Sequence, residues 1–164
     1  MIRVELTFDE AAVARLLEWL ADVNHRLMLA SPSMPLLYDS GVVYRRELRE
    51  RFSDYAHVLL RGHDDCDSLA AARVGELRAR GWRALRPGEG GYEIAQVTRP
   101  ETIPARIVIR TRRPKDDPGQ YHVLLNYQLG GTTFYDDPSA RLGMYSRRLG
   151  AEETQRHLAE FHKS

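Results

Sequence analysis

Residues 63–81 read HDDCDSLAAARVGELRARG and contain the only cysteine of the 164-residue chain. The spacing of apolar residues after Cys66 predicts an amphipathic helix over residues 66–80. Asp64 or Asp65 can cap its start, because an aspartate side chain accepts hydrogen bonds from the first backbone N–H groups of a helix. Gly81 is suited to end it, since glycine adopts the left-handed conformation that closes many helices. Cys66 is therefore expected in the first turn.

The segments after this helix have the composition of β-strands separated by turn-forming sequences. Turns such as RPGEGG and LGG are short, and short turns between successive strands favour antiparallel pairing. The predicted strands are Trp82–Leu85, Tyr92–Thr98, Arg106–Arg112, Tyr121–Tyr127 and Thr132–Tyr135.

The segments before and after this core are expected to be mainly helical. Residues 2–6 alternate like a short strand, and Asp9 caps a predicted helix that ends near Leu29. A second helix is predicted from Tyr44 to Leu60, and residues 151–163 resemble a short terminal helix. Helices followed by a strand meander predict an α+β fold, with the N-terminal helices, including the cysteine-bearing one, packed on an antiparallel β-sheet.

Composition narrows the class of protein. The chain has 24 Lys and Arg against 23 Asp and Glu, a net charge of +1, which does not favour binding to nucleic acid or to an anionic membrane. The arginines from Arg73 to Arg113 are scattered among apolar residues and are expected on a solvated surface. No apolar run is long enough to span a bilayer, no export signal is visible, and a single cysteine fits a reducing compartment. A cytoplasmic protein is expected.

Cys66 is placed where a helix N-terminus favours a thiolate, because unpaired N–H groups and the helix dipole stabilise negative charge. The neighbouring Asp64, Asp65 and Asp67 oppose ionisation of the thiol. A positioned histidine solves this conflict by accepting the thiol proton. The sequence therefore predicts that a reactive Cys66 needs a histidine nearby.

His122 is the candidate partner, in the stretch YHVLLNYQLGGTTFYDDPS at residues 121–139. The turn at residues 129–131 is expected to return the next strand antiparallel, so that Asp136 and Asp137 come back beside His122. Pro138 disfavours a helical conformation at Asp137 and keeps that residue extended. A carboxylate beside the imidazole fixes its tautomer and stabilises its cation, as in a nucleophile–base–acid triad.

Taken singly, each of these residues has a simpler interpretation. A lone cysteine is usually a small core residue, and a histidine on an apolar strand is usually structural. Together, in this order and on these elements, they favour catalysis. A metal site at residues 63–67 is less favoured because one contiguous segment seldom wraps an ion by itself, and no metal or cofactor is expected.

Three stretches carry a resemblance to a known family. Residues 61–84, RGHDDCDSLAAARVGELRARGWRA, and residues 121–144, YHVLLNYQLGGTTFYDDPSARLGM, resemble the transglutaminase-like branch of the papain-like cysteine enzymes. With residues 35–47, PLLYDSGVVYRRE, they are similar to small transglutaminase-like proteins encoded in bacteriophage and prophage structural-gene regions. The likeness spans roughly residues 35–145. It implies one transglutaminase-like domain over residues 1–164, with residues 1–34 as an N-terminal strand–helix extension.

The resemblance implies that Cys66 is the nucleophile, His122 the base and Asp137, rather than Asp136, the orienting acid. Amide or isopeptide hydrolysis, or acyl transfer, is then expected through a thioester. Tyr44 and Tyr55 are candidate oxyanion or substrate-binding donors. The expected acyl donor is a peptide or protein, either a peptidoglycan stem peptide or a phage structural protein, in the bacterial cytoplasm or in a virion. The alternative is a catalytically silent fold that serves as a binding or virion-assembly module.

Overall fold

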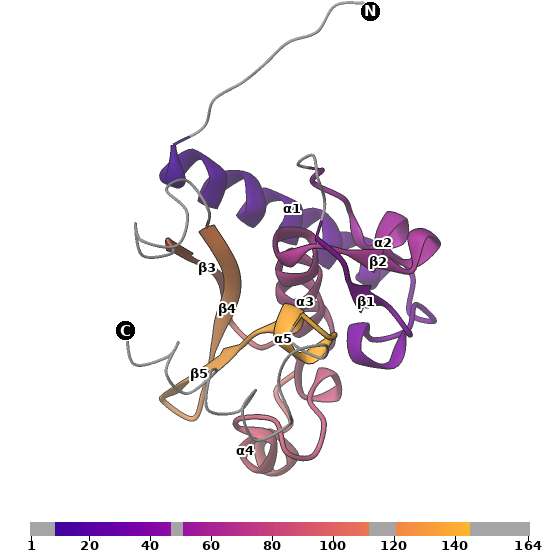
Figure 1. The fold of residues 1–164 in the computed structure, drawn as a ribbon. Helices are drawn as coiled ribbons and strands as arrows, with labels where there is room; N and C mark the ends of the chain where they lie inside the picture. Colours follow the sequence, from indigo (N-terminus) through magenta and orange to yellow (C-terminus); the bar gives the residue numbers. More distant parts are fainter. Residues whose placement is uncertain (1–8, 47–50, 112–120, 145–164) are drawn as a thin grey trace, which may run out of the picture.

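The computed structural model describes residues 9–46, 51–111 and 121–144, in which helices pack on a three-stranded antiparallel sheet (Figure 1). This bears out the α+β class expected from the sequence. The predicted strand at residues 2–6 and the predicted helix at residues 151–163 lie outside the described residues. The helices are α1 (Glu10–Ala30), the 3₁₀ turn η1 (Leu37–Asp39), α2 (Tyr55–Arg61), α3 (Cys66–Arg80), the 3₁₀ turn η2 (Gly81–Ala84), α4 (Tyr92–Thr98) and α5 (Pro138–Arg141). The strands are β1 (Val43–Tyr44), β2 (His63–Asp64), β3 (Ala105–Thr111), β4 (Tyr121–Leu129) and β5 (Thr132–Asp136).

Helix α3 lies at the centre of the molecule and confirms the helix predicted over residues 66–80. Asp65 occupies the N-cap position, but its side chain makes no capping hydrogen bond. Gly81 has a φ of +54°, and a Cβ there would lie 2.1 Å from the carbonyl oxygen of Pro100, so only glycine fits this turn. Helix α3 differs from the expected amphipathic helix because every residue from Asp67 to Leu77 is buried.

Helix α1 packs along α3 and confirms the helix predicted to start after Asp9. The Asp9 carboxylate accepts a hydrogen bond from the Ala12 N–H at 2.7 Å and so caps the first turn. The two helices approach closely at Gly75, where a Cβ would lie 2.6 Å from the Asn24 Cβ. Although the sequence places residues 1–34 in an N-terminal extension, α1 contributes Val13, Leu17 and Leu20 to the main core.

The sheet has the order β3-β4-β5, and both pairings are antiparallel. Gly130 and Gly131, at φ of +55° and +79°, form the tight turn between β4 and β5 and set Leu129 opposite Thr132. Alternate residues of β4 point to opposite faces of the sheet. One of these faces packs on α1 and α3 through Val123, Leu125, Tyr127 and Leu129.

The outer edge of β3 is covered by side chains from the helices. The backbone N–H of Ile107 donates to the Glu18 carboxylate at 2.7 Å, and Arg78 donates to the carbonyl oxygen of Ala105 at 2.7 Å. Arg78 also pairs with Glu18 at 2.7 Å, which joins α1 to α3 at this edge. Two backbone groups at the start of β3, the Ile107 N–H and the Ala105 carbonyl oxygen, are thus occupied rather than open to another strand.

Two of the predicted strands are helical. Residues 82–84 of the expected strand Trp82–Leu85 belong to η2, because Gly81, at positive φ, turns the chain so that the Trp82 N–H donates to the Pro100 carbonyl oxygen at 2.9 Å. The expected strand Tyr92–Thr98 is the helix α4, in which Ala95 is the buried residue and Tyr92, one turn earlier, packs against the core. Short apolar runs of this length do not distinguish a strand from a helix.

The helix predicted from Tyr44 to Leu60 is much shorter in the structure. Tyr44 belongs to β1, which pairs in parallel with β2, whereas α2 begins only at Tyr55. Its start is fixed by Asp54, whose carboxylate accepts a hydrogen bond from the His57 N–H at 3.0 Å. Residues 47–50 lie outside the described residues.

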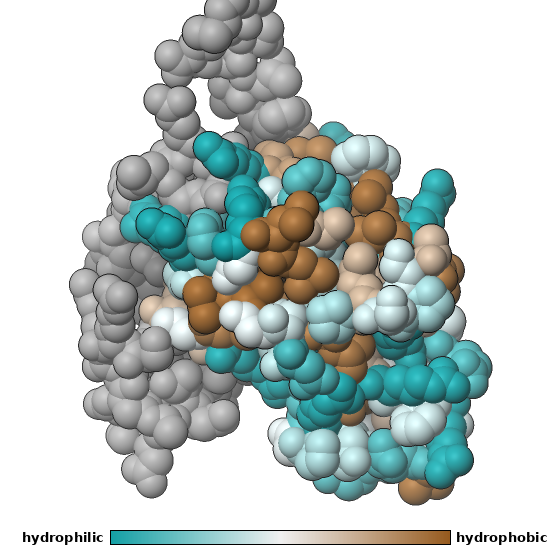
Figure 2. All heavy atoms as spheres, turned by 90° about the vertical axis from the view of Figure 1, so that its right-hand side faces the viewer, coloured by the Kyte–Doolittle hydropathy of each residue, from teal (hydrophilic) through white to brown (hydrophobic). Residues whose placement is uncertain are grey.

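Apolar side chains gather near the middle of the face shown in Figure 2, which is the side of the molecule where β1 and α2 lie. On these two elements Val43 is 53% exposed and Leu60 is 84% exposed. Among the described residues, none of the helices combines the length and apolar character that crossing a bilayer requires.

Candidate active site

His122 and Asp137 form a buried hydrogen-bonded pair at one end of the β4–β5 hairpin. The Nε2 atom of His122 lies 2.8 Å from the Oδ2 atom of Asp137, and the residues are 2% and 5% exposed. The register of the hairpin explains why His122 and Asp137 are in contact. Asp136 pairs with Leu125, and side chains alternate between the two faces of the sheet. Asp137, one residue beyond Asp136, and His122, three residues before Leu125, therefore share one face of the hairpin, the one opposite to Leu125.

The two oxygens of Asp137 have different partners. Oδ2 faces His122, whereas Oδ1 accepts a hydrogen bond from the Ala140 N–H at 3.1 Å and so caps α5. Asp137 is extended, with φ −124° and ψ 92°, as the following proline predicts. An ionised carboxylate only accepts hydrogen bonds, so a neutral imidazole that makes this contact has its proton on Nε2 and its basic nitrogen at Nδ1.

Cys66 is the first residue of α3, is partly buried and packs against the main core. The backbone N–H of Val123 donates a hydrogen bond to the Cys66 sulfur, which places the thiol against β4 beside the residue that follows His122. The Asp137 carboxylate is near enough to act on the thiol electrostatically. The start of α3, the start of β4 and the end of β5 therefore meet at this site.

The environment of the thiol favours its neutral form. Burial raises the pKa of the Cys66 thiol above its ordinary value, and the carboxylates of Asp67, Asp65 and Asp137 raise it further. The hydrogen bond from the Val123 N–H acts in the opposite direction but is outweighed. Cys66 is thus a thiol at neutral pH in the resting protein, rather than a thiolate.

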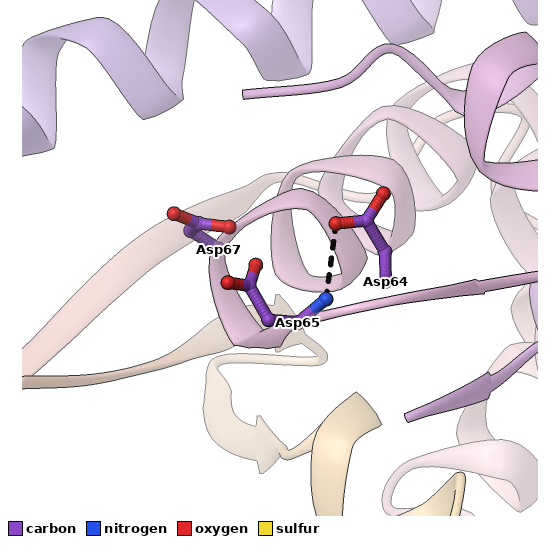
Figure 3. Close-up of side chains that lie close together, drawn as sticks. All are labelled: Asp64, Asp65 and Asp67. Atoms are coloured by element: carbon purple, nitrogen blue, oxygen red, sulfur yellow. Dashed lines mark hydrogen bonds between the residues drawn. The ribbon is translucent and has the colours of Figure 1, made fainter. Parts of the chain in front are cut away.

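Three aspartates crowd the N-terminus of α3 (Figure 3). One oxygen of each of Asp64, Asp65 and Asp67 lies within 4.8 Å of the others, which is a spacing that a hard cation can bridge. Local contacts already occupy the cluster: Asp64 accepts a hydrogen bond from the Asp65 N–H at 3.0 Å and pairs with Arg61, and Asp67 accepts one from the Ser68 N–H at 2.6 Å. These contacts explain the positions of Asp64 and Asp67 without a cation.

The two tyrosines suggested by the sequence lie in different surroundings. The Tyr55 hydroxyl donates to the carbonyl oxygen of Pro35 at 3.0 Å, inside a second core cluster that does not include Cys66. Burial raises the pKa of Tyr55, and we do not assign this residue to the site. Tyr44 pairs in register with Asp64, two residues before Cys66, and is the better placed of the two.

A buried ion network that the sequence did not predict lies next to this site. Arg73, expected on a solvated surface, is 0% exposed and lies in the middle of α3. Its guanidinium donates to Asp136 at 3.0 Å, to Glu89 at 2.9 Å and to the Ala84 carbonyl oxygen at 2.9 Å, and it also pairs with Glu76. The available signal was an Arg and a Glu three residues apart in a helix otherwise rich in Ala, Leu and Val.

Further contacts extend this network to the surface side of α5. Arg141 lies 3.2 Å from Asp136 and pairs with Glu89, and the Tyr38 hydroxyl donates to Asp136 at 2.8 Å. The guanidiniums of Arg73 and Arg141 lie 4.6 and 4.8 Å from the Tyr38 ring centroid, within cation–π range. Asp136 is therefore held by the network, whereas Asp137 is held by His122.

No protein-family model, curated protein or solved structure matches this chain. The likeness to transglutaminase-like enzymes thus rests on the quoted residues alone. The geometry adds a buried histidine–carboxylate pair whose carboxylate acts electrostatically on the only cysteine of the chain, at the start of a helix.

Proposed function

We propose that the protein is a thiol-dependent amide or isopeptide hydrolase, or an acyl transferase, in which Cys66, His122 and Asp137 act as a triad. The observation that carries the proposal is the buried His122–Asp137 hydrogen bond of 2.8 Å beside the Cys66 thiol. A buried imidazole oriented by a carboxylate is the arrangement that activates a neighbouring nucleophile.

In the proposed reaction His122 acts as a general base during the attack, because the resting thiol is neutral. As the Cys66 sulfur bonds to the substrate carbonyl carbon, Nδ1 of His122 takes the thiol proton, and Asp137 stabilises the resulting imidazolium. The imidazolium then protonates the leaving amine as the C–N bond breaks, which leaves a thioester on Cys66. Water or an acceptor amine resolves the thioester and restores the thiol.

The backbone N–H of Cys66 is suited to stabilise the oxyanion, because the first N–H groups of a helix point out of its N-terminus. Tyr44 is the proposed second donor, on the strand beside Asp64. The carboxylates of Asp65 and Asp67 disfavour a second negative charge nearby, so the oxyanion needs both donors.

The proposed acyl donor is a peptide or protein. The resemblance to phage-encoded proteins supports two substrates, a peptidoglycan stem peptide or a phage structural protein. The proposed location is the cytoplasm of a bacterial host or a virion. A protein made in that cytoplasm and carried in a virion would encounter both the stem peptide and the structural protein. No nucleic acid, metal or cofactor takes part in the proposed reaction.

Trapping of the thioester tests the proposal. The protein is incubated with p-nitrophenyl acetate and, separately, with stem-peptide and capsid-peptide amides, and the acyl group on Cys66 is located by mass spectrometry. We expect a hydroxylamine-sensitive acyl group on Cys66 that forms about 10²- to 10⁴-fold more slowly in His122→Ala. His57→Ala is the matched control, because His57 is an exposed histidine that also pairs with an aspartate. Equal acylation rates in the wild type and in His122→Ala would contradict the proposed role of His122.

A second candidate function is a catalytically silent binding or assembly module. The neutral Cys66 thiol supports it, and so do the exposed apolar side chains of Val43 on β1 and Leu60 on α2. If none of these donors acylates Cys66 in the folded protein, this function replaces the enzymatic one.

A further inference from the structure

The Arg73 network touches both halves of the proposed site without containing any member of the triad. Arg73 lies seven residues after Cys66, which is two turns along the same helix. Through Nε it donates to Oδ2 of Asp136 at 3.0 Å, and Asp136 immediately precedes Asp137. One guanidinium therefore links the helix that begins at Cys66 to the strand that ends at Asp137.

Asp137 is held on both sides by this network. On its N-terminal side, Asp136 is bound by Arg73 and by the Tyr38 hydroxyl at 2.8 Å. On its C-terminal side, Arg141 of α5 lies 3.2 Å from Asp136 and pairs with Glu89. The backbone on either side of the carboxylate is thus tied to buried charges, which leaves Asp137 little freedom to turn away from His122.

Alternation along the strand explains how the network acts without touching the histidine. Successive side chains of an extended strand point to opposite faces. Asp136 points to the face that packs on α3, and Asp137 points to the face that carries His122. A shift of the Asp136 side chain would therefore move the adjacent peptide and, with it, the carboxylate that orients the imidazole.

The contacts of Arg73 require an arginine rather than a single positive charge. Nε, Nη1 and Nη2 each donate to a different acid, Asp136, Glu76 and Glu89, and Nη1 also donates to the Ala84 carbonyl oxygen. A lysine ammonium keeps the charge but cannot reproduce this planar fork. Replacing Arg73 by lysine thus removes the hydrogen-bond geometry of the guanidinium while keeping its positive charge.

We propose that Arg73 and Asp136 are positioning residues, which hold Asp137 and His122 in register with the helix that bears Cys66. This inference rests on the proposed function for its catalytic meaning, but its geometric content concerns only the His122–Asp137 pair. Neither Arg73 nor Asp136 touches the reacting atoms in this assignment.

The test compares Arg73→Lys and Asp136→Asn with the wild type and with Arg78→Lys. Arg78 is the matched control because it also lies on α3 and bridges two acids, Glu18 and Asp22, but it does so at the β3 edge. The ring ¹⁵N shifts of His122 are measured in the full chain at about pH 8, above the ordinary pKa of histidine. Thioester formation from p-nitrophenyl acetate is followed in the same samples.

We expect the wild type and Arg78→Lys to show one fixed tautomer, with the proton on Nε2. In Arg73→Lys and Asp136→Asn the two ring nitrogens should move toward averaged shifts, and the maximal acylation rate should fall tenfold or more with little change in KM. A structural role alone would not move the tautomer of a histidine that neither residue touches.

The outcomes separate this inference from the proposed function. A fixed Nε2 tautomer in folded Arg73→Lys and Asp136→Asn overturns the positioning role, whether or not Cys66 is acylated. Averaged shifts in the variants, together with no acylation in the wild type, support the positioning of the pair and contradict the enzymatic function. If both variants are unfolded where Arg78→Lys is folded, the network acts on the fold as a whole and the positioning role is overturned.

Discussion

Two groups of buried charges lie along α3, and they are built differently. At the middle of the helix, Arg73 and Arg141 face three carboxylates, those of Glu76, Glu89 and Asp136. At its N-terminus, Asp64, Asp65 and Asp67 surround Cys66, and Arg61 forms an ion pair with Asp64. The first group is closely paired, whereas the second concentrates negative charge around a thiol.

The two groups differ in how far each carboxylate is matched by a cation or a hydrogen-bond donor. In the central group, the acids raise the pKa of Arg73 although burial alone would lower it, so the guanidinium stays charged. In the N-terminal group, Oδ1 of Asp65 is buried and has no hydrogen-bond partner among the described residues, and the carboxylates help to raise the pKa of Cys66. Unfavourable electrostatics of this kind are typical of functional sites, where stability is lost to chemistry.

Removing the charge of Arg73 should produce the largest effect. Arg73→Met leaves Glu76, Glu89 and Asp136 buried without their central cation, so the free energy of unfolding should fall by about 3–5 kcal/mol. Urea denaturation measures the loss. Arg83→Met is the control, because Arg83 and Glu101 form an exposed pair whose loss should cost at most about 1 kcal/mol. Similar losses in the two variants would remove the distinction between the central group and an ordinary surface pair.

The thiol should make the protein less stable at alkaline pH. The folded pKa of Cys66 is raised, so above the ordinary thiol pKa of about 8.5 the unfolded chain loses a proton that the folded chain keeps. The contribution of Cys66 to stability is complete below that pH and declines above it. Between about pH 8.5 and 9.5 the decline should be about 1 kcal/mol, and it should be absent in Cys66→Ser.

Urea denaturation of wild type and Cys66→Ser over this pH range measures the difference. Both proteins contain the tyrosines with raised pKa, Tyr38, Tyr55 and Tyr127. Their contribution to the free energy of unfolding therefore cancels when the two proteins are compared at the same pH. Parallel pH profiles would mean that the folded thiol ionises normally and that its surroundings are less unfavourable than the contacts indicate.

Removing the N-cap side chains of α2 and α3 should change the free energy of unfolding least. Asp54 caps α2 with a side-chain hydrogen bond, whereas Asp65 occupies the N-cap of α3 without one. Asp54→Ala should therefore lower the free energy of unfolding by about 0.5–1 kcal/mol, and Asp65→Ala by less, because it also removes a repulsive charge. Thermal and urea denaturation report both changes. A larger loss for Asp65→Ala would show that its carboxylate stabilises α3 despite the crowding.

Elements with strong local signals could be predicted from the sequence. Helix α3 was expected over residues 66–80 and is found there: Asp65 takes the N-cap position, although without a capping hydrogen bond, and Gly81 ends the helix. The β4–β5 turn was predicted from Gly130 and Gly131, and its antiparallel return brings Asp137 to His122 as expected. The catalytic roles of Cys66, His122 and Asp137 stay predictions.

Features that depend on tertiary contacts escaped prediction. Residues 92–98 have the composition of a strand, yet α4 forms because Tyr92 and Ala95, one helical turn apart, both meet the core. Burial of Arg73 depends on Glu89 and Asp136, which lie 16 and 63 residues away in the chain. No local pattern links such distant residues, and a solvated arginine is the ordinary expectation.

The covered edge of β3 has a consequence for how copies of the chain meet. An exposed strand edge is a template on which another chain can add a strand, and such addition leads to fibres or swapped dimers. Here an incoming strand would have to displace Glu18 from the Ile107 N–H and Arg78 from the Ala105 carbonyl oxygen, and break the ion pair between them. The contacts that join α1 to α3 thus also hinder the addition of a strand at the start of β3.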